Sequence, residues 1–298
     1  MQPRFLPRTL ALLAGAALAS AGALARAEQI LHHVHGLAFT PDGAALVVPA
    51  HIGLAVYRDG RWMRSPGPPH DLMGFSMAER AIYSSGHPVP NTPLANPLGL
   101  VKSTDGGKTW QPLGLAGEAD FHAMAVGYRS GAVYVVNAAA NSRMPRPGIY
   151  FTTDDGRSWK RSEAAGVEAE VIGTAAHPTE AGTVAVGTLG GLYLSRDFGA
   201  RFARIGDASP VPAVAFDLDG KHLYFSGDSG SKLSRIALDG RGNTTLGLPA
   251  IGSDVVFYIA QNPTKPSELA IATRKRHVFL SRDAGRTWTQ IARDGAPM

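Results

Sequence analysis

The sequence has no cysteine among its 298 residues. This absence excludes a disulfide framework and a lipid anchor on an N-terminal cysteine, so the chain would tolerate an oxidising compartment without exploiting it. After residue 27 it also lacks any twelve-residue window with the period of a helix. Short apolar or alternating runs separated by Gly, Pro and Asp turns fill the chain instead, which predicts an all-β fold.

A strong charge of one sign is missing as well. The formal net charge is +5, and Arg4, Arg8 and Arg26 in the first 27 residues carry three of those positive charges. The remainder carries about +2, so charge gives no support to nucleic-acid binding.

The first 27 residues have the features of an export signal. Arg4 and Arg8 precede an apolar run over residues 10–24, and Ala25-Arg26-Ala27 provides small residues for cleavage. The run is too short for a membrane span. We predict a signal peptide over residues 1–27, cleaved near Ala27, and a periplasmic or secreted protein without a membrane span in its mature chain.

One eight-residue pattern recurs along the chain. It reads Ser-Thr-Asp-Gly-Gly-Lys-Thr-Trp at residues 103–110 and returns with variations at 152–159, 195–202 and 281–288. Its aspartates are Asp105, Asp154, Asp197 and Asp283, and weaker copies centre on Asp59 and Asp239. Successive aspartates are 42–49 residues apart, a spacing typical of propeller blades.

Each unit can be divided into four short strands. In the first unit these are residues 34–40, 46–50, 54–57 and 62–65. Four-stranded antiparallel units in tandem form blades around an axis, and closing the ring removes most exposed sheet edges. We predict a single domain over residues 28–298, a six-bladed β-propeller whose termini meet between two blades, with seven blades as the alternative.

The recurring pattern resembles the Asp-box, or BNR, repeat of sialidases and sortilin-like propellers. In such a turn the Ser or Thr and Asp side chains bond to turn amides, Gly takes a positive φ and the Trp packs. The four box aspartates are therefore interpreted as structural. Segments 33–37, 73–75, 85–88, 96–100 and 118–122 further resemble exported bacterial propellers labelled glycosyl hydrolase-like, a resemblance that brings no catalytic assignment.

Histidines are concentrated in the first half of the chain, with seven of ten before residue 123. In a propeller the first strand of each blade lines the central channel, so we aligned the first strands by the turns that end them. Two sets of equivalent residues result, namely His35, Met73 and His122, and two positions earlier His33, Asp71 and Asp120. Because residues i and i+2 share a face of a strand, two partial rings of ligand-type side chains are expected at the channel mouth.

The loops between second and third strands add His51 and His87 to the same face. The predicted metal or ligand set is therefore His33, His35, His51, Asp71, His87 and His122. Imidazole with carboxylate suits zinc or another transition metal, whereas Met73 and Met124 beside the imidazoles would favour copper. The alternative is that the histidines bond to backbone carbonyls or line a wet channel.

Basic residues are expected on the same face. Arg274 and Arg276 belong to the sixth unit, and Arg143 and Arg146 to a long loop of the third. We predict that Arg274 and Arg276 bind an anion, with a solvated basic loop as the alternative.

A glycoside hydrolase is the second hypothesis. The first strands do not begin with the arginines that a sialidase uses to bind a carboxylate. Hydrolysis needs two carboxyl groups, and the candidates for them are Asp71, Asp120 and Glu118. The same residues are equally suited to orient histidines.

The leading hypothesis is an exported, non-enzymatic and monomeric propeller that binds a metal ion or small ligand at the channel mouth. The third hypothesis is a periplasmic assembly platform whose basic loops contact a protein partner.

Overall fold

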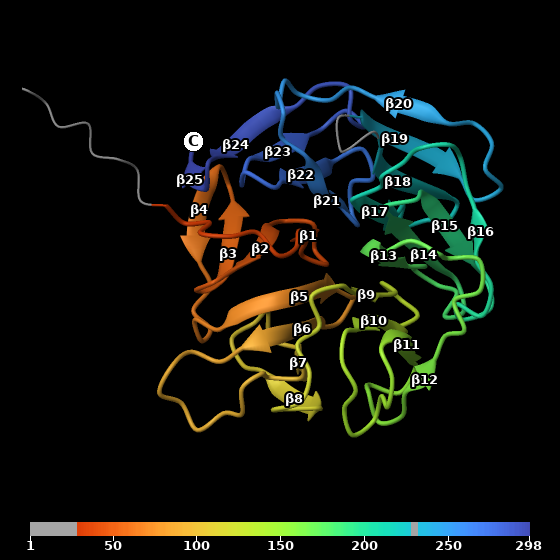
Figure 1. Cartoon of the computed structure of the whole chain (residues 1–298). Coiled ribbons are helices and arrows are strands. Elements are labelled where there is room, and N and C mark those ends of the chain that lie inside the picture. Colours follow the sequence, from red (N-terminus) through yellow and green to blue (C-terminus); the bar gives the residue numbers. More distant parts are fainter. Residues whose placement is uncertain (1–28, 228–231) are drawn as a thin grey trace, which may run out of the picture.

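The structure, a computed structural model, describes residues 29–227 and 232–298, so the predicted signal peptide lies outside the described part. Six antiparallel sheets follow one another along the chain and surround an axis, as Figure 1 shows. The prediction of an all-β, six-bladed propeller is confirmed. Over the two described ranges there is no helix, and therefore none that could cross a bilayer.

Every blade is built from consecutive strands that pair in chain order. The first three blades contain β1 (Ala38–Phe39), β2 (Leu46–Ala50), β3 (Gly53–Arg58), β4 (Arg61–Arg64), β5 (Asp71–Met77), β6 (Ile82–His87), β7 (Leu100–Ser103), β8 (Gln111–Gly114), β9 (Met124–Val126), β10 (Val133–Asn137), β11 (Gly148–Thr152) and β12 (Lys160–Arg161).

The last three blades follow the same order. They contain β13 (Val171–Ala176), β14 (Val184–Thr188), β15 (Leu192–Ser195), β16 (Ala203–Arg204), β17 (Ala213–Phe216), β18 (His222–Gly227), β19 (Lys232–Ala237), β20 (Thr244–Leu246), β21 (Val256–Gln261), β22 (Leu269–Thr273), β23 (Val278–Ser281), β24 (Thr289–Arg293) and β25 (Ala296–Pro297). The strand β25 makes the sixth sheet five-stranded, which the repeat pattern did not predict.

The first strand of blade one is shorter than predicted. Residues 34–40 were expected to be extended, but only Ala38 and Phe39 pair with β2. Pro49 of β2 has no N–H to donate, so the ladder is interrupted where it would continue toward the N-terminus. A single bond from the His35 N–H to the Pro49 carbonyl, 3.3 Å long, remains. The histidine-bearing segment before β1 is thus outside the regular ladder.

Hydrophobic cores lie between the blades. Side chains of a strand alternate between the two faces of its sheet, so each blade buries its faces against its two neighbours. The described residues form six buried clusters, one for each pair of adjacent blades. Val47 and Phe75 share the cluster between blades one and two, and Val48 and Ile291 share the one between blades one and six.

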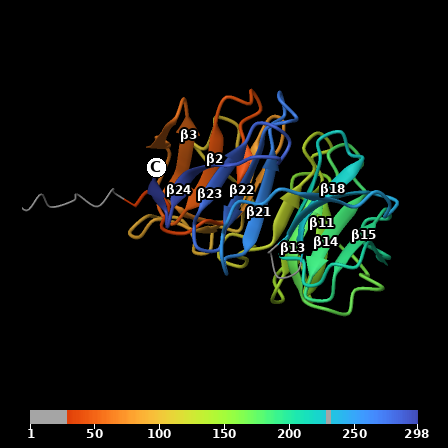
Figure 2. The ribbon, with the colours of Figure 1, turned by 90° about the horizontal axis from the view of Figure 1, so that it is seen from above.

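The ring closes by contacts between blades one and six, without an exchanged strand. The N–H groups of Ile30 and Leu31 donate to the Gly295 carbonyl at 3.1 and 3.0 Å. The indole Nε1 of Trp62 donates to the Ile291 carbonyl at 2.7 Å. Figure 2, turned by 90°, shows β2 and β3 of blade one beside β22 to β24 of blade six.

The Asp boxes connect the third and fourth strands of their blades. In the second blade, Ser103 Oγ accepts the Gly107 N–H at 2.8 Å, and Asp105 Oδ1 accepts the Thr109 N–H at 3.0 Å. Hydrogen bonds from Thr109 and Ser103 lower the pKa of Asp105 to about 2. Two successive residues, Gly106 and Gly107, have φ of 77° and 85°, one more positive-φ position than predicted.

The box glycine also fits against the preceding blade. A Cβ on Gly107 would overlap the Leu54 side chain of blade one. A Cβ on Gly285 would press on Leu246 of blade five. The boxes therefore serve both their own turn and the joint between blades.

Replacing Ser103 with Ala should destabilise the propeller. The variant leaves the buried Gly107 N–H without its acceptor, which we expect to cost about 1–3 kcal/mol of unfolding free energy. Urea unfolding followed by tryptophan fluorescence measures this. Ser267→Ala is the control, because Ser267 is exposed, and it should unfold like the wild type. Equal stabilities of the two variants would contradict the proposed role of the box.

Candidate functional site

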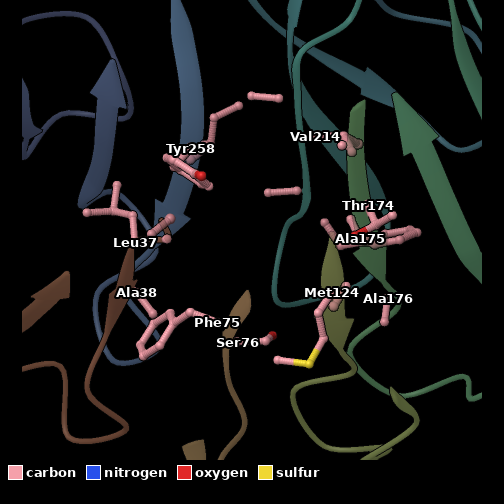
Figure 3. Close-up of a pocket in the computed structure, with 18 of the residues that line it drawn as sticks. Leu37, Ala38, Phe75, Ser76, Met124, Thr174, Ala175, Ala176, Val214 and Tyr258 are labelled. Atoms are coloured by element: carbon pink, nitrogen blue, oxygen red, sulfur yellow. The ribbon is translucent and has the colours of Figure 1, made fainter. Parts of the chain in front are cut away.

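A central channel passes between the blades. Its cavity has a volume of about 490 Å³ and is lined by residues of β1, β5, β9, β13, β17 and β21, the first strands of all six blades. Figure 3 shows Phe75, Met124 and Tyr258 among the side chains around it. His35 and His122 are part of the lining, so the two aligned positions from blades one and three open onto one space.

Three histidines of blade one meet at the channel mouth. His33 and His35 precede β1, and His51 lies in the turn between β2 and β3. Their nearest ligand nitrogens all lie within 4.8 Å of one another. The ring centroids are 4.0 Å apart for His33 and His51, and 5.2 Å apart for His35 and His51. We call these three residues the histidine triad.

Two buried polar atoms at the triad have no hydrogen-bond partner among the described residues. They are Nε2 of His35 and Oδ1 of Asp71. The other carboxylate oxygen of Asp71, Oδ2, is 3.6 Å from His51 Nδ1. Because buried polar atoms are almost always satisfied in proteins, both orphaned atoms indicate a place for an ion, a water molecule or a ligand.

Burial and nearby positive charge favour the neutral forms of His35 and His33. The pKa of His35 is lowered to about 4, first by burial and then by the neighbouring His51, His33 and His122. The pKa of His33 is also lowered, first by burial and then by His51 and Arg276. At neutral pH these imidazoles carry no proton on one ring nitrogen, the form that coordinates a metal.

A second group forms around Asp120, at the start of blade three. Its Oδ2 is 2.7 Å from His122 Nε2 and 3.1 Å from His87 Nε2. Burial acts to raise the pKa of Asp120, but the hydrogen bonds and charges of His122 and His87 outweigh it, and the pKa is lowered. The hydrogen bond to Asp120 raises the pKa of His122. We call His87, Asp120 and His122 the Asp120 group.

A glycine positions His87 in this group. Gly86 has φ of 137°, and a Cβ there would overlap the Asp71 carbonyl. The close approach places His87 opposite Asp71 across β5 and β6. Asn96 Oδ1 contacts His87 Nδ1 at 2.6 Å, a partner that sequence reasoning missed. Its signal was the loop insertion that follows His87.

The other predicted residues lie outside the histidine triad. Met73 is half-buried and lines neither described cavity, and Met124 lines the channel from within the core between blades two and three. The Glu118 carboxylate accepts the Ser142 N–H at 2.7 Å in the long loop of blade three. Arg143 donates to the carbonyl of Gly156. Thioether ligation through Met73 and a role for Glu118 in hydrolysis stay predictions.

A second cavity adjoins the triad on the side of blade six. Its volume is about 530 Å³, and its lining includes His33, Arg274, Lys275, Arg276 and Asp294. Both arginines predicted to bind an anion therefore lie beside the triad. Lys275 belongs to the same basic run, whereas Asp294 was not predicted.

A second cluster of ligand-type residues is already satisfied. Asp217, Asp219 and His222 have potential ligand atoms within 4.8 Å of one another. Asp217 Oδ2, however, forms an ion pair with Arg235 at 3.0 Å and a contact with His222 Nδ1 at 3.0 Å. The Asp217 carboxylate is therefore already paired with the positive charge of Arg235, from the same blade.

Family and sequence comparisons agree with this architecture. A model of the BNR/Asp-box repeat matches residues 101–112. The chain is thus a propeller with an Asp-box repeat in its second blade. A xyloglucanase of Hypocrea jecorina (strain QM6a) is 28% identical over 149 residues, which are 45% of this chain and 17% of that enzyme.

Solved structures show the same fold at low identity. The GH74 enzyme of Niastella koreensis is 16% identical with a TM-score of 0.59, covering 87% of this chain and 45% of that one. The GH74 xyloglucanase of Xanthomonas campestris is 17% identical with a TM-score of 0.55, covering 89% and 46%. YCF48 bound to D1 peptide is 18% identical with a TM-score of 0.50, covering 89% and 83%. The chain spans less than half the length of these GH74 enzymes.

The Asp120 group gives a spectroscopic prediction. In metal-free protein, His122 should titrate above 6.5, because Asp120 stabilises its protonated form, and Asp120→Asn should lower that pKa. An NMR pH titration of the histidine Hε1 signals measures it. Glu118→Gln, which removes a nearby carboxylate bonded to Ser142, should leave the titration unchanged. An unshifted His122 signal in Asp120→Asn would contradict the assignment.

Proposed function

We propose that this propeller binds a divalent transition-metal ion at the channel mouth through His33, His35 and His51. The observation that supports it most is the convergence of three imidazole nitrogens within 4.8 Å, in a group where His35 Nε2 is buried without a partner among the described residues. Buried polar atoms are almost always satisfied in proteins, so this nitrogen is available to an ion.

The donor set favours an ion of the zinc or copper(II) type. Three imidazoles that leave one coordination position open are typical of catalytic zinc sites. Imidazole donors also suit copper(II), whereas thioether sulfur favours copper(I), and Met73 lies outside both cavities. Asp71 lies beside the triad and supplies a negative charge that offsets the ion.

The open coordination position would face the channel. His35 belongs both to the triad and to the lining of the 490 Å³ cavity. A water molecule or a small ligand in that cavity would therefore reach the ion. Export of the chain remains a prediction from residues 1–27.

Metal titration tests the proposal. Purified protein, stripped with a chelator and dialysed against zinc or copper(II), should retain one ion per chain. His35→Ala should weaken binding by about 100-fold or more, because it removes a donor from a three-donor site. Isothermal titration calorimetry and elemental analysis measure both quantities.

His122→Ala is the matched control for the metal titration. His122 lies at the same mouth but outside the triad, so this variant should bind the ion as the wild type does. Circular dichroism of each variant shows that it is folded. A wild-type protein that retains neither zinc nor copper would overturn the proposal.

Glycoside hydrolysis is the second candidate, favoured by the similarity to xyloglucanases. A general acid for this reaction needs a raised pKa, whereas the pKa values of Asp120 and Glu118 are both lowered. If the protein is a hydrolase, it should cleave xyloglucan or an aryl glycoside, lose that activity in Asp71→Asn and keep it after metal removal. If the mouth is a metal site and not a hydrolase site, the metal-free protein should cleave neither xyloglucan nor an aryl glycoside.

A further inference from the structure

The cavity beside the triad is lined by three consecutive cationic residues. Arg274, Lys275 and Arg276 connect β22 to β23, and Asp294 is the one acidic residue among the described residues that line the cavity. Asp294 is 67% exposed and lies 3.9 Å from His277. The cavity therefore carries an excess of positive charge on a wall shared with His33.

Two of these cations have few partners of their own. Among the residues that the structure describes, the Arg274 guanidinium makes no hydrogen bond or ion pair, and Lys275 Nζ has only a 3.4 Å contact with Ser253 Oγ. Arg276 differs, because its Nη1 donates to the His32 carbonyl at 3.0 Å. Arg274 and Lys275 are thus available to a ligand, while Arg276 also holds the chain beside the triad.

The loop that carries the cations is held by backbone contacts. Asp254 is buried, and its Oδ1 accepts the N–H groups of Val255 and Lys275 at 2.8 and 3.1 Å. The Arg276 N–H donates to the Thr273 carbonyl at 2.9 Å, in a turn where Arg276 has φ of 65°. A loop anchored in this way pays little ordering entropy when its side chains bind a ligand.

We infer that this cavity binds the carboxylate or phosphate group of a small organic anion. Arginine and lysine supply charge-assisted hydrogen bonds to such groups. The apolar side chains of Val34 and Phe257 line the same cavity and fit the organic part of the ligand. The inference rests on the proposed function in one respect: an ion at the triad would attract the same anion across His33, which lines this cavity and belongs to the triad.

Calorimetric titration with benzoate tests this inference in metal-free and zinc-loaded protein. Benzoate should bind to both forms, and more tightly to the zinc-loaded one. The double variant Arg274→Gln/Lys275→Gln should weaken binding by about tenfold or more, since it removes two charged donors. Arg276 is left in place because it holds the His32 carbonyl.

The matched control is Arg282→Gln/Arg286→Gln. It removes two exposed positive charges from the same blade, at residues that line neither cavity. This variant should bind benzoate as the wild type does. An equal loss in both double variants would show a diffuse effect of net charge and overturn the inference.

The remaining outcomes separate the two proposals. A protein that binds zinc but does not bind benzoate would overturn the anion site and leave the metal site intact. Benzoate binding that depends on Arg274 and Lys275 in a protein that retains no zinc would support the anion site and refute the metal site. Inorganic phosphate that binds as tightly as benzoate would refute the organic part of the ligand, because phosphate makes no contact with Val34 or Phe257.

Discussion

Burial of apolar side chains between neighbouring blades is the constraint on which the whole molecule depends. A four-stranded sheet with two apolar faces cannot remain in water, and each blade covers one face of each of its two neighbours. Six cores between six blades satisfy this requirement only if the last blade reaches the first. Leu31, which is fully buried, and the Trp62 bond to blade six therefore contribute to the whole ring and not just to one sheet.

Ring closure is also what assembles the candidate site. The triad comes from blade one, Asp71 from blade two, Asp120 from the start of blade three and Arg276 from blade six. Placing imidazoles this close disfavours their protonated forms, as the pKa of about 4 for His35 indicates. The inter-blade cores can hold the neutral rings together, and an ion that bound them would stabilise the folded state further.

The repeat pattern was enough to predict the blades, because box turns recur at the same place in each. The strand alignment correctly placed His35 and His122 on one channel. The alignment could not show that the ladder between β1 and β2 is interrupted at Pro49. The missing N–H of a proline interrupts a ladder only if that N–H would have faced the neighbouring strand. The alignment could not show Asn96 beside His87, because that contact depends on how the loop after His87 packs. It also could not show that Met73 lines neither cavity, because a bulge in β5 changes the face to which a side chain points.

The groups on either side of the triad differ in charge, and this difference defines what the mouth can accept. On one side the Asp120 group combines a carboxylate with an imidazole whose pKa is raised, so it can hold or release a proton. On the other side Arg274 and Lys275 present positive charge to a cavity whose lining also includes Val34 and Phe257. A ligand spanning the triad would thus place its anionic end toward blade six and its protonatable end toward blades two and three. A neutral sugar would use neither polarity, so the distribution of charge supports the proposed anion over a neutral glycan.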